Sequence, residues 1–282
     1  MMTSESDHGR TGPDLRSRSA AYESMRACLD VQATAPTRSW IERFFGRSPL
    51  HPDAREAYRG AVGELEVSRL LSRLDESWTV LSAVPIGGAE QDIDHVLIGA
   101  RGVFTVHTPN HAGKRIWASG TAFAVNGQKK RYVHRALAEA ERVSDLLARA
   151  SGIRVPVSPL IVVVDPASIT GSFPDVHVVA AHGLLRLLKR QPRAFADDTV
   201  ASVVQGAMRR STWGRSAATQ FDIADRNWQF ERLRAEVVRA RTRRHLWSTV
   251  ARVSLVALAV VAAILFFRTM PDLVSRLFVV SE

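Results

Sequence analysis

Residues 91–113 read QDIDHVLIGARGVFTVHTPNHAG and decide the fold, because they hold two apolar runs joined by the short turn GARG. Such a pattern is typical of a β-hairpin. Pairing the strands across this turn gives three expected pairs of facing residues: Ile98 with Val103, Val96 with Thr105, and Asp94 with His107. Side chains alternate between the two faces of a strand, so Asp94, His107 and position 109 are predicted to share one face.

The segments around the hairpin predict further helices and strands. A helix is expected from Asp53 to Leu74, because its apolar residues recur at helical spacing, and a second helix is expected over residues 128–150. Apolar runs bounded by turn residues predict five more strands, at residues 78–84, 114–118, 123–127, 157–165 and 176–180. We therefore predict an α/β fold with a mixed central sheet flanked by helices.

The composition changes along the chain and predicts six regions. The N-terminal region is polar and rich in Ser, Thr, Arg, Gly and Pro, so it cannot bury enough apolar surface to order itself. The expected regions are a flexible polar tail at 1–37, a short helical lead-in at 38–56, the α/β domain at 57–195, a basic helical segment at 196–245, a transmembrane helix at 246–267 and a short tail at 268–282. Within the lead-in, WIERFFG (residues 40–46) is amphipathic; packing on the domain is favoured over membrane contact.

Residues 246–267, LWSTVARVSLVALAVVAAILFF, form a long apolar run near the C-terminus. As a helix, this run would span about 33 Å, which is enough to cross a bilayer core of about 30 Å. Only Arg252 interrupts it, near the N-terminal end, where a long side chain can reach the headgroups. We predict a transmembrane helix, with a buried core helix as the alternative.

The charge of the chain indicates anionic partners and an orientation in the membrane. Lys and Arg outnumber Asp and Glu by 38 to 28, a net charge of +10 that suits nucleic acid or anionic lipid. Four arginines crowd the N-terminal flank of the apolar run and only two bases follow the run: Arg239, Arg241, Arg243 and Arg244, then Arg268 and Arg276. The positive-inside rule therefore predicts a single-pass protein of the cell membrane with its N-terminal domain in the cytoplasm. The four preceding arginines are expected to attract anionic lipid.

The sequence lacks the motifs that mark several functional classes. The chain has one cysteine, Cys28, so it can form no intrachain disulfide and has no Cys-x-x-Cys zinc or redox motif. The first twenty residues are polar, so no cleaved secretory signal is expected. Gly-rich phosphate loops, nucleophile elbows and dinucleotide fingerprints are also absent from the sequence.

Three segments together resemble a known family: GAVGELEVSRLL, DIDHVLIGARGVFTVHTPNHAG and IWASGTAFAVNGQ. They are similar to the nuclease-related domain (NERD), a branch of the restriction-endonuclease-like PD-(D/E)xK fold, over residues 57–165. The resemblance implies a nuclease centre made by Asp, Glu and Lys from two adjacent strands, the second ending in Glu-x-Lys-Asn. Asp94 and Asn110 occupy the expected Asp and Asn positions, but His107 replaces the Glu and Pro109 replaces the Lys.

These replacements bear on catalysis. Phosphodiester hydrolysis of this kind uses a hard divalent cation, and magnesium prefers oxygen ligands to imidazole. A positioned cation stabilises charge in the transition state by about 2.7 to 4 kcal/mol, whereas proline has no side-chain donor. We therefore predict that Glu64, Asp94 and His107 mark vestigial catalytic positions, that no metal or cofactor is bound, and that this pseudoenzyme acts in binding or scaffolding.

One other interpretation of the site stays open, a divergent metal-dependent phosphodiesterase, that is, a nuclease that uses Glu64, Asp94 and His107. With His111, these residues offer a softer site for zinc or manganese, although a metal-free Asp94–His107 pair is favoured. Lys114 and Arg115 are candidates to replace the missing cation, with exposed loop charges as the favoured interpretation.

A basic segment after the domain's strand-like runs is a candidate nucleic-acid contact. Its cations are Lys129, Lys130, Arg131 and Arg135, and Tyr132 among them is able to stack on a base. The alternative is a solvated helix N-terminus. Organisation of a membrane surface through protein contacts is a third functional class, for which the sequence identifies no partner.

Overall fold

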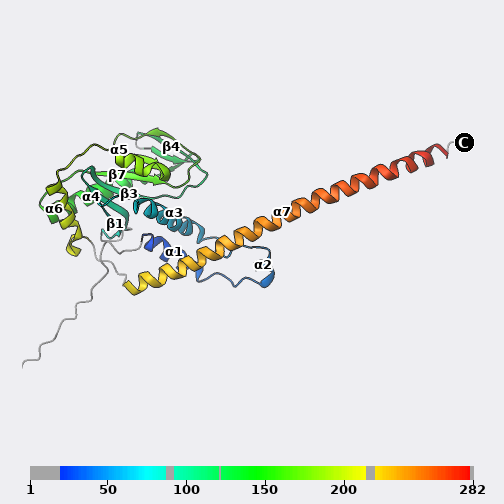
Figure 1. Ribbon diagram of the computed structural model, residues 1–282, viewed down its shortest axis with the longest axis horizontal. Helices are drawn as coiled ribbons and strands as arrows, with labels where there is room; N and C mark the ends of the chain where they lie inside the picture. Colours follow the sequence, from blue (N-terminus) through cyan, green and yellow to red (C-terminus); the bar gives the residue numbers. More distant parts are fainter. Residues whose placement is uncertain (1–19, 87–91, 121, 214–219, 280–282) are drawn as a thin grey trace, which may run out of the picture. The chain divides into compact units, whose positions relative to one another are not determined.

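The computed structural model describes residues 20–86, 92–120, 122–213 and 220–279 (Figure 1). The chain divides into two compact units, one made of Met1–Thr34 with His51–Phe230 and the other of Ala35–Leu50 with Glu231–Glu282. The first unit contains the α/β domain, and the second contains most of the long C-terminal helix. Each is described separately below.

The α/β domain is built on a five-stranded mixed sheet in the order β1-β2-β3-β7-β9. Its strands are β1 (Trp78–Val84), β2 (Ile93–Gly99), β3 (Gly102–His107), β7 (Val157–Val163) and β9 (His177–Ala180). The first three are antiparallel and the last two join in parallel. The predicted hairpin register is confirmed, since Ile98 pairs with Val103 and Val96 with Thr105.

A second, four-stranded sheet was not anticipated, so the prediction of one mixed sheet is incomplete. Its order is β6-β5-β4-β8, with β4 (Arg115–Ser119), β5 (Ala122–Val125), β6 (Gln128–Lys130) and β8 (Ser168–Ser172). β6 and β8 are short, polar and largely exposed, so they lack the apolar alternation that marks a strand. Because β6 takes Gln128–Lys130, the helix expected over 128–150 begins at Tyr132 instead.

Helices cover both faces of the five-stranded sheet (Figure 1). One core joins β1, β2 and β3 to α4 (Tyr132–Ser151) and α6 (Asp197–Met208). The opposite core joins β2, β3 and β7 to α3 (Arg55–Leu71) and α5 (Leu184–Arg190). Short 3-10 turns, Ala181–Gly183 and Arg210–Thr212, precede α5 and follow α6. The predicted α/β class with a mixed sheet flanked by helices is confirmed.

The prediction of a flexible tail over residues 1–37 is wrong for its second half. Residues 1–19 lie outside the described part of the chain, but Tyr22–Gln32 forms the helix α1. Four of its side chains are buried: Tyr22, Met25, Cys28 and Leu29. These side chains lie at positions i, i+3, i+6 and i+7 of one helix face, an amphipathic pattern that the surrounding polar composition concealed. The lead-in at 38–56 contains the short helix α2 (Trp40–Phe44).

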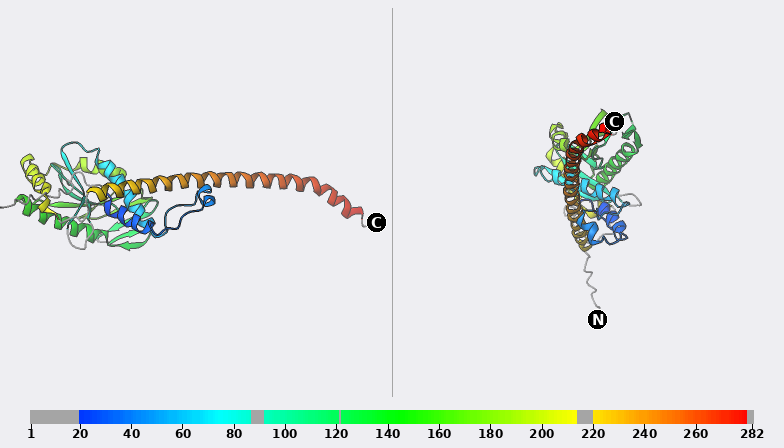
Figure 2. Two further views of the ribbon diagram at one scale, coloured as in Figure 1. Left: turned by 90° about the horizontal axis from the view of Figure 1, so that it is seen from below. Right: turned by 90° about the vertical axis from the view of Figure 1, so that its right-hand side faces the viewer.

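One helix, α7, runs over Gln220–Val279 without a break (Figure 2). It joins the end of the predicted basic segment, the whole predicted span and residues 268–279 of the predicted tail, so the boundaries at 245 and 267 are changes of composition and not of structure. Upstream, the basic segment also holds α6, and residues 214–219 between the helices lie outside the described residues. Part of α7 is long and apolar enough to cross a membrane, and its apolar side chains are exposed.

Candidate functional site: a charge cluster at the open end of the hairpin

Asp94 and His107 meet across the β2–β3 hairpin, as the register predicts. The Nδ1 atom of His107 lies 3.6 Å from Oδ2 of Asp94, which is within ion-pair distance but longer than a hydrogen bond. The same carboxylate oxygen accepts a 2.6 Å hydrogen bond from the backbone N–H of Thr108. Both side chains are only 12% exposed, so this pair is largely shielded from water.

The environment of Asp94 favours its charged form. Burial alone would raise its pKa, but the partner His107, the nearby His95 and the Thr108 N–H outweigh burial and lower the pKa below its ordinary value. His95 is fully buried and its Nδ1 lies 3.0 Å from the Ser82 hydroxyl on β1. Burial lowers the pKa of His95 to about 4, so this histidine is neutral and structural at physiological pH.

Glu64 reaches the cluster from α3 and, unlike Asp94, favours its protonated form. Its carboxyl group accepts a 2.5 Å hydrogen bond from the Ser24 hydroxyl of α1. Burial and the negative charge of Asp94 raise its pKa well above the ordinary value near 4.5, and the contacts with Ser24 and Arg135 offset this only in part. Two neighbouring carboxyl groups thus have their pKa values pushed apart, with Asp94 ionised and Glu64 favouring the proton.

The position of Glu64 follows from close packing at Gly63. A Cβ atom at Gly63 would lie 3.2 Å from Cβ of Asn110 and 3.3 Å from Cγ2 of Val164, so a larger residue there would push these neighbours away from α3. Asn110 holds the contact from the other side by donating its Nδ2 to the Arg59 carbonyl at 2.8 Å. The Gly63-Glu64 pair therefore docks the helix against the strand ends and directs the carboxyl group to the site.

Helix α4 adds a cation and a third carboxylate. Nε of Arg135 lies 2.6 Å from Oε1 of Glu139, one turn further along the helix, and the Glu139 side chain is 8% exposed. Both groups interact electrostatically with Asp94. Burial raises the pKa of Glu139, while Arg135 and His107 act to lower it. The cluster therefore holds Glu64, Asp94, His107, Arg135 and Glu139.

Sequence reasoning missed this contribution from α4. Arg135 is predicted there only as a nucleic-acid contact, and Glu139 receives no role. The signal that was available is the position of Glu139 on the apolar face of α4, next to the buried Ala136 and Ala140, with an arginine four residues before it. Ser24 was missed because it lies in the supposed tail.

His111 is linked to the cluster through Tyr132, whose ring lies 5.2 Å from the His107 ring and 5.7 Å from the His111 ring. The Nε2 atom of His111 lies 3.1 Å from the Tyr132 hydroxyl. Burial, and to a smaller extent the positive charges of Lys114 and Lys130, lower the pKa of His111 to about 4. Among the residues that the structure describes, no three His, Cys, Asp or Glu side chains are placed to hold a metal ion. The softer site expected from Glu64, Asp94, His107 and His111 is therefore not assembled.

The predicted nucleic-acid residues divide into two groups. Lys129 and Lys130 are exposed on β6, and Arg131 is exposed just before α4. Arg135 is instead part of the charge cluster through Glu139. Arg115 is exposed and is the first residue of β4. The positive charge of Lys114 contributes to lowering the pKa of His111.

A test of the Glu64 environment follows from its raised pKa. The folded protein holds this proton to a higher pH than the unfolded chain, so folding stability falls as pH rises above about 4.5 toward the folded pKa. Glu64→Gln cannot ionise, so we expect it to lose less stability than the wild type between pH 5 and pH 8, by about 1 kcal/mol or more. Chemical unfolding at both pH values measures this. The exposed Glu141→Gln is the control, and equal pH dependence in Glu64→Gln and wild type would contradict the assignment.

Comparison with known proteins places these residues in a family. Residues 59–164 match the family model of the nuclease-related domain, close to the interval 57–165 expected from the sequence. No curated protein and no solved structure matches the chain. The matched stretch contains all five members of the charge cluster. The stretch that holds the charge cluster, residues 59–164, thus matches the nuclease-related domain (NERD).

Proposed function

We propose that this protein is a membrane-anchored nuclease-related domain that has lost phosphodiester hydrolysis and acts in binding or scaffolding. The observation that carries the proposal is the engagement of Asp94, whose Oδ2 faces both the Thr108 N–H and His107. A carboxylate that already accepts from a fixed backbone donor and faces the His107 imidazole at 3.6 Å gains little from a metal ion. The pairing of Arg135 with Glu139 supports the same view, because the added cation has a carboxylate partner within the cluster.

The residues present do not fit the divalent metal that the fold family implies. Magnesium needs several oxygen ligands, but His107 offers nitrogen and one oxygen of Asp94 already accepts from the Thr108 N–H. No suitable group of three ligands occurs in the described part of the chain. We therefore assign no reaction step to a metal.

The test is a nuclease assay on the full chain, purified in detergent, with plasmid DNA, single-stranded DNA and RNA. With magnesium or manganese added, all three substrates are expected to stay intact. Cleavage that is lost in Asp94→Asn would overturn the proposal, because contaminating nucleases do not respond to that substitution.

The second candidate function is a divergent phosphodiesterase that uses Glu64, Asp94 and His107. One observation favours it: α4 brings a guanidinium and a carboxylate close enough to act on Asp94, and these are the two group types missing from the second strand. In that case Arg135→Gln would abolish cleavage in the same assay by removing charge stabilisation, a loss of about 10² to 10³-fold.

Nucleic acid is the ligand that we propose for the domain, through Lys129, Lys130 and Arg131. Each phosphate contact that is lost should lower the slope of log affinity against log salt by about 0.7 to 0.9. We expect Lys129→Gln with Lys130→Gln to weaken single-stranded DNA binding and reduce this slope, measured by fluorescence anisotropy over a salt series. The control replaces Lys189 and Arg190, an exposed basic pair on α5. An affinity that does not change with salt concentration would contradict phosphate contacts and favour a protein as the partner.

The membrane anchor is the apolar part of α7, residues 246–267. The excess of arginines before it, Arg239, Arg241, Arg243 and Arg244, supports a cytoplasmic nuclease-related domain in the cell membrane and an attraction to anionic lipid.

A further inference from the structure

Residues 35–50 are fixed along α7 just before the apolar run. The Arg243 guanidinium donates to the Arg43 carbonyl at 3.0 Å, and the Trp247 indole N–H donates to the Phe44 carbonyl at 3.0 Å. The backbone at Gly46 comes so close that a Cβ atom would lie 2.5 Å from the Ala240 carbonyl oxygen. Glycine is required there, and α2 is thereby held beside the last cytoplasmic turns of α7.

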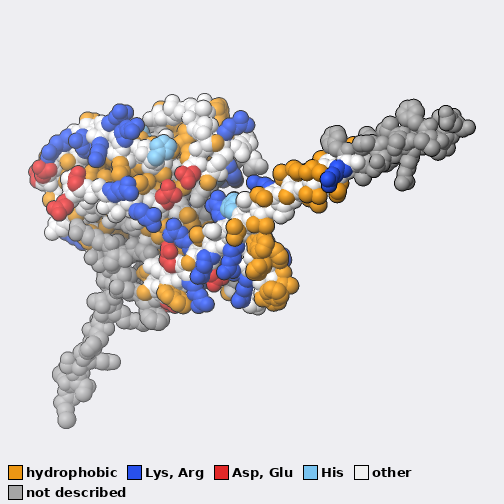
Figure 3. All heavy atoms as spheres, turned by 45° about the vertical axis from the view of Figure 1, so that its right-hand side comes forward, with side chains coloured by type: hydrophobic (Ala, Val, Ile, Leu, Met, Phe, Trp, Pro, Cys, Tyr) orange, Lys and Arg blue, Asp and Glu red, His pale blue; other side chains and the backbone are white. Residues whose placement is uncertain are grey.

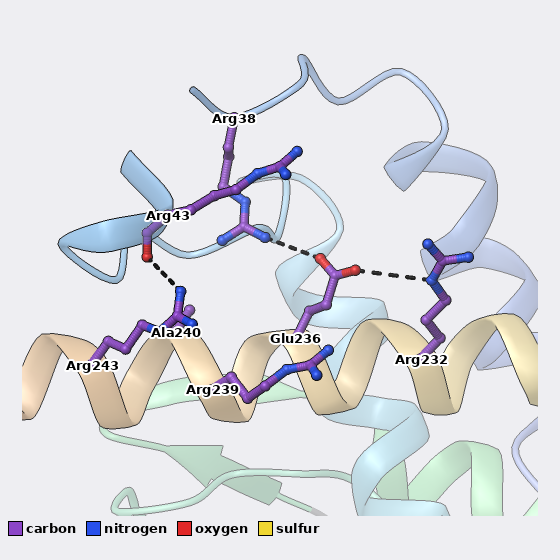
Figure 4. Close-up of a pocket in the computed structure, with 7 residues that line it drawn as sticks. All are labelled: Arg38, Arg43, Arg232, Glu236, Arg239, Ala240 and Arg243. Atoms are coloured by element: carbon purple, nitrogen blue, oxygen red, sulfur yellow. Dashed lines mark hydrogen bonds and ion pairs between the residues drawn. The ribbon is translucent and has the colours of Figure 1, made fainter. Parts of the chain in front are cut away.

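A cavity of about 300 Å³ lies between this segment and α7 (Figure 4). Five arginines, one glutamate and one alanine line it: Arg38, Arg43, Arg232, Arg239, Arg243, Glu236 and Ala240. Glu236 accepts from Arg38 at 3.0 Å and lies 4.0 Å from Arg232. Five positive charges against one negative charge leave the lining with a formal charge of +4. In the described part of the chain, neither Arg43 nor Arg239 has an acidic partner.

The surface beside this cavity has the composition of a membrane interface. Exposed apolar side chains gather on α2 and the following residue, with arginines beside them (Figure 3): Trp40, Ile41, Phe44 and Phe45. The rings of Phe44 and Phe45 lie 4.9 and 5.1 Å from the Trp247 ring, at the start of the predicted span. Tryptophan and other aromatic residues favour the headgroup level, and an exposed apolar patch of this kind marks a binding surface.

Along the axis of α7, the cavity lies at the level expected for the lipid headgroups. A helix rises 1.5 Å per residue, so Arg243 lies about 6 Å and Arg239 about 12 Å from Trp247 along the axis. The polar layer of a bilayer is about 5 to 8 Å thick on each side, and helix tilt shortens the distance to the membrane plane. The cavity therefore begins where lipid phosphates lie.

We propose that this cavity binds the phosphate-bearing headgroup of an anionic lipid, while the aromatic side chains of α2 and Phe45 lie in the interface beside it. The inference rests on the proposed membrane span of α7. Arginine suits the ligand because its planar fork donates two parallel hydrogen bonds to phosphate oxygens. Arg43 and Arg239 are the two direct contacts, since their guanidinium groups are not committed to Glu236.

The experiment measures binding of short-chain lipids to the full chain in detergent by isothermal titration calorimetry. Phosphatidylglycerol is the probe, phosphatidylcholine of the same chain length tests the need for net charge, and inorganic phosphate tests the need for a lipid. Arg43→Gln with Arg239→Gln removes two charges from the cavity. Arg241→Gln with Arg244→Gln removes two charges from the same stretch of α7 outside the cavity lining.

We expect phosphatidylglycerol to bind and the cavity variant to lose about tenfold or more in affinity, as two charge-assisted hydrogen bonds would predict. The matched variant should lose much less. Equal losses in both variants would overturn the inference in favour of diffuse attraction, and equal binding of phosphatidylcholine or of inorganic phosphate would overturn a lipid-specific site. Resistance of the chain to alkaline carbonate extraction tests the span itself, so failure of the anchor is separable from failure of the lipid site.

Discussion

Asp94→Ala is expected to destabilise the nuclease-related domain by about 1 to 3 kcal/mol, the cost of leaving a buried hydrogen-bond donor unsatisfied. The substitution leaves the Thr108 N–H without its acceptor and removes the carboxylate that faces His107, at a position that is only 12% exposed. Unfolding by denaturant, followed in the full chain in detergent, measures the change.

The control for this prediction is Asp145→Ala on α4. Asp145 pairs with Arg154, but its side chain is 42% exposed, and exposed ion pairs contribute about 0 to 1 kcal/mol. The negative charge of Asp94 also raises the pKa of Glu64, so removing this charge relieves some repulsion. A net gain in stability in Asp94→Ala would mean that this repulsion outweighs the contacts of Asp94, and it would contradict the closed charge cluster.

Leu258→Arg combined with Val261→Arg is expected to remove the protein from the membrane. Both residues are exposed near the middle of the apolar run of α7. A charged residue at the centre of a span costs about 2.5 to 3.5 kcal/mol on insertion, so two cost about 5 to 7 kcal/mol. That change shifts the insertion equilibrium by more than a thousandfold. After carbonate extraction of membranes, the variant should therefore be lost from the membrane pellet.

The matched control adds two arginines to α7 outside the apolar run. Val238 is exposed and lies before the span, as does Glu231. Val238→Arg with Glu231→Arg should leave the chain in the membrane fraction. If the variant at Leu258 and Val261 also stays there, α7 does not span the bilayer, and both the anchor and the lipid site lose their basis.

The sequence predicts the hairpin well because its physical signals are local. Alternating apolar residues on both sides of GARG set the register, and the register alone brings Asp94 opposite His107. Glu64, which the family resemblance predicts as a site position, interacts electrostatically with Asp94. The prediction of a transmembrane helix at residues 246–267 depends only on the length and apolar composition of that run.

Other parts depend on tertiary contacts that leave little trace in the sequence. β6 and β8 are strands because they pair with β5 and β4, and their own residues do not favour strands. α1 packs on α3, where the Ser24 hydroxyl donates to Glu64, and this contact cannot be read from the polar sequence around it. Arg135 and Glu139 lie far along the chain from the hairpin, and only the packing of α4 on the sheet reveals their approach to Asp94.

The most direct test of the central claim, that the former catalytic site is closed by its own charges, is the melting temperature of the full chain with and without magnesium or manganese. A ligand that binds only the folded state stabilises it by about 2.7 kcal/mol at one hundred times its Kd. We predict no change for the wild type, and a metal-dependent rise in His107→Glu with Pro109→Lys, where the oxygen ligand and the cation of the family pattern are restored. A metal-dependent rise in the wild type that disappears in Asp94→Asn would contradict the account.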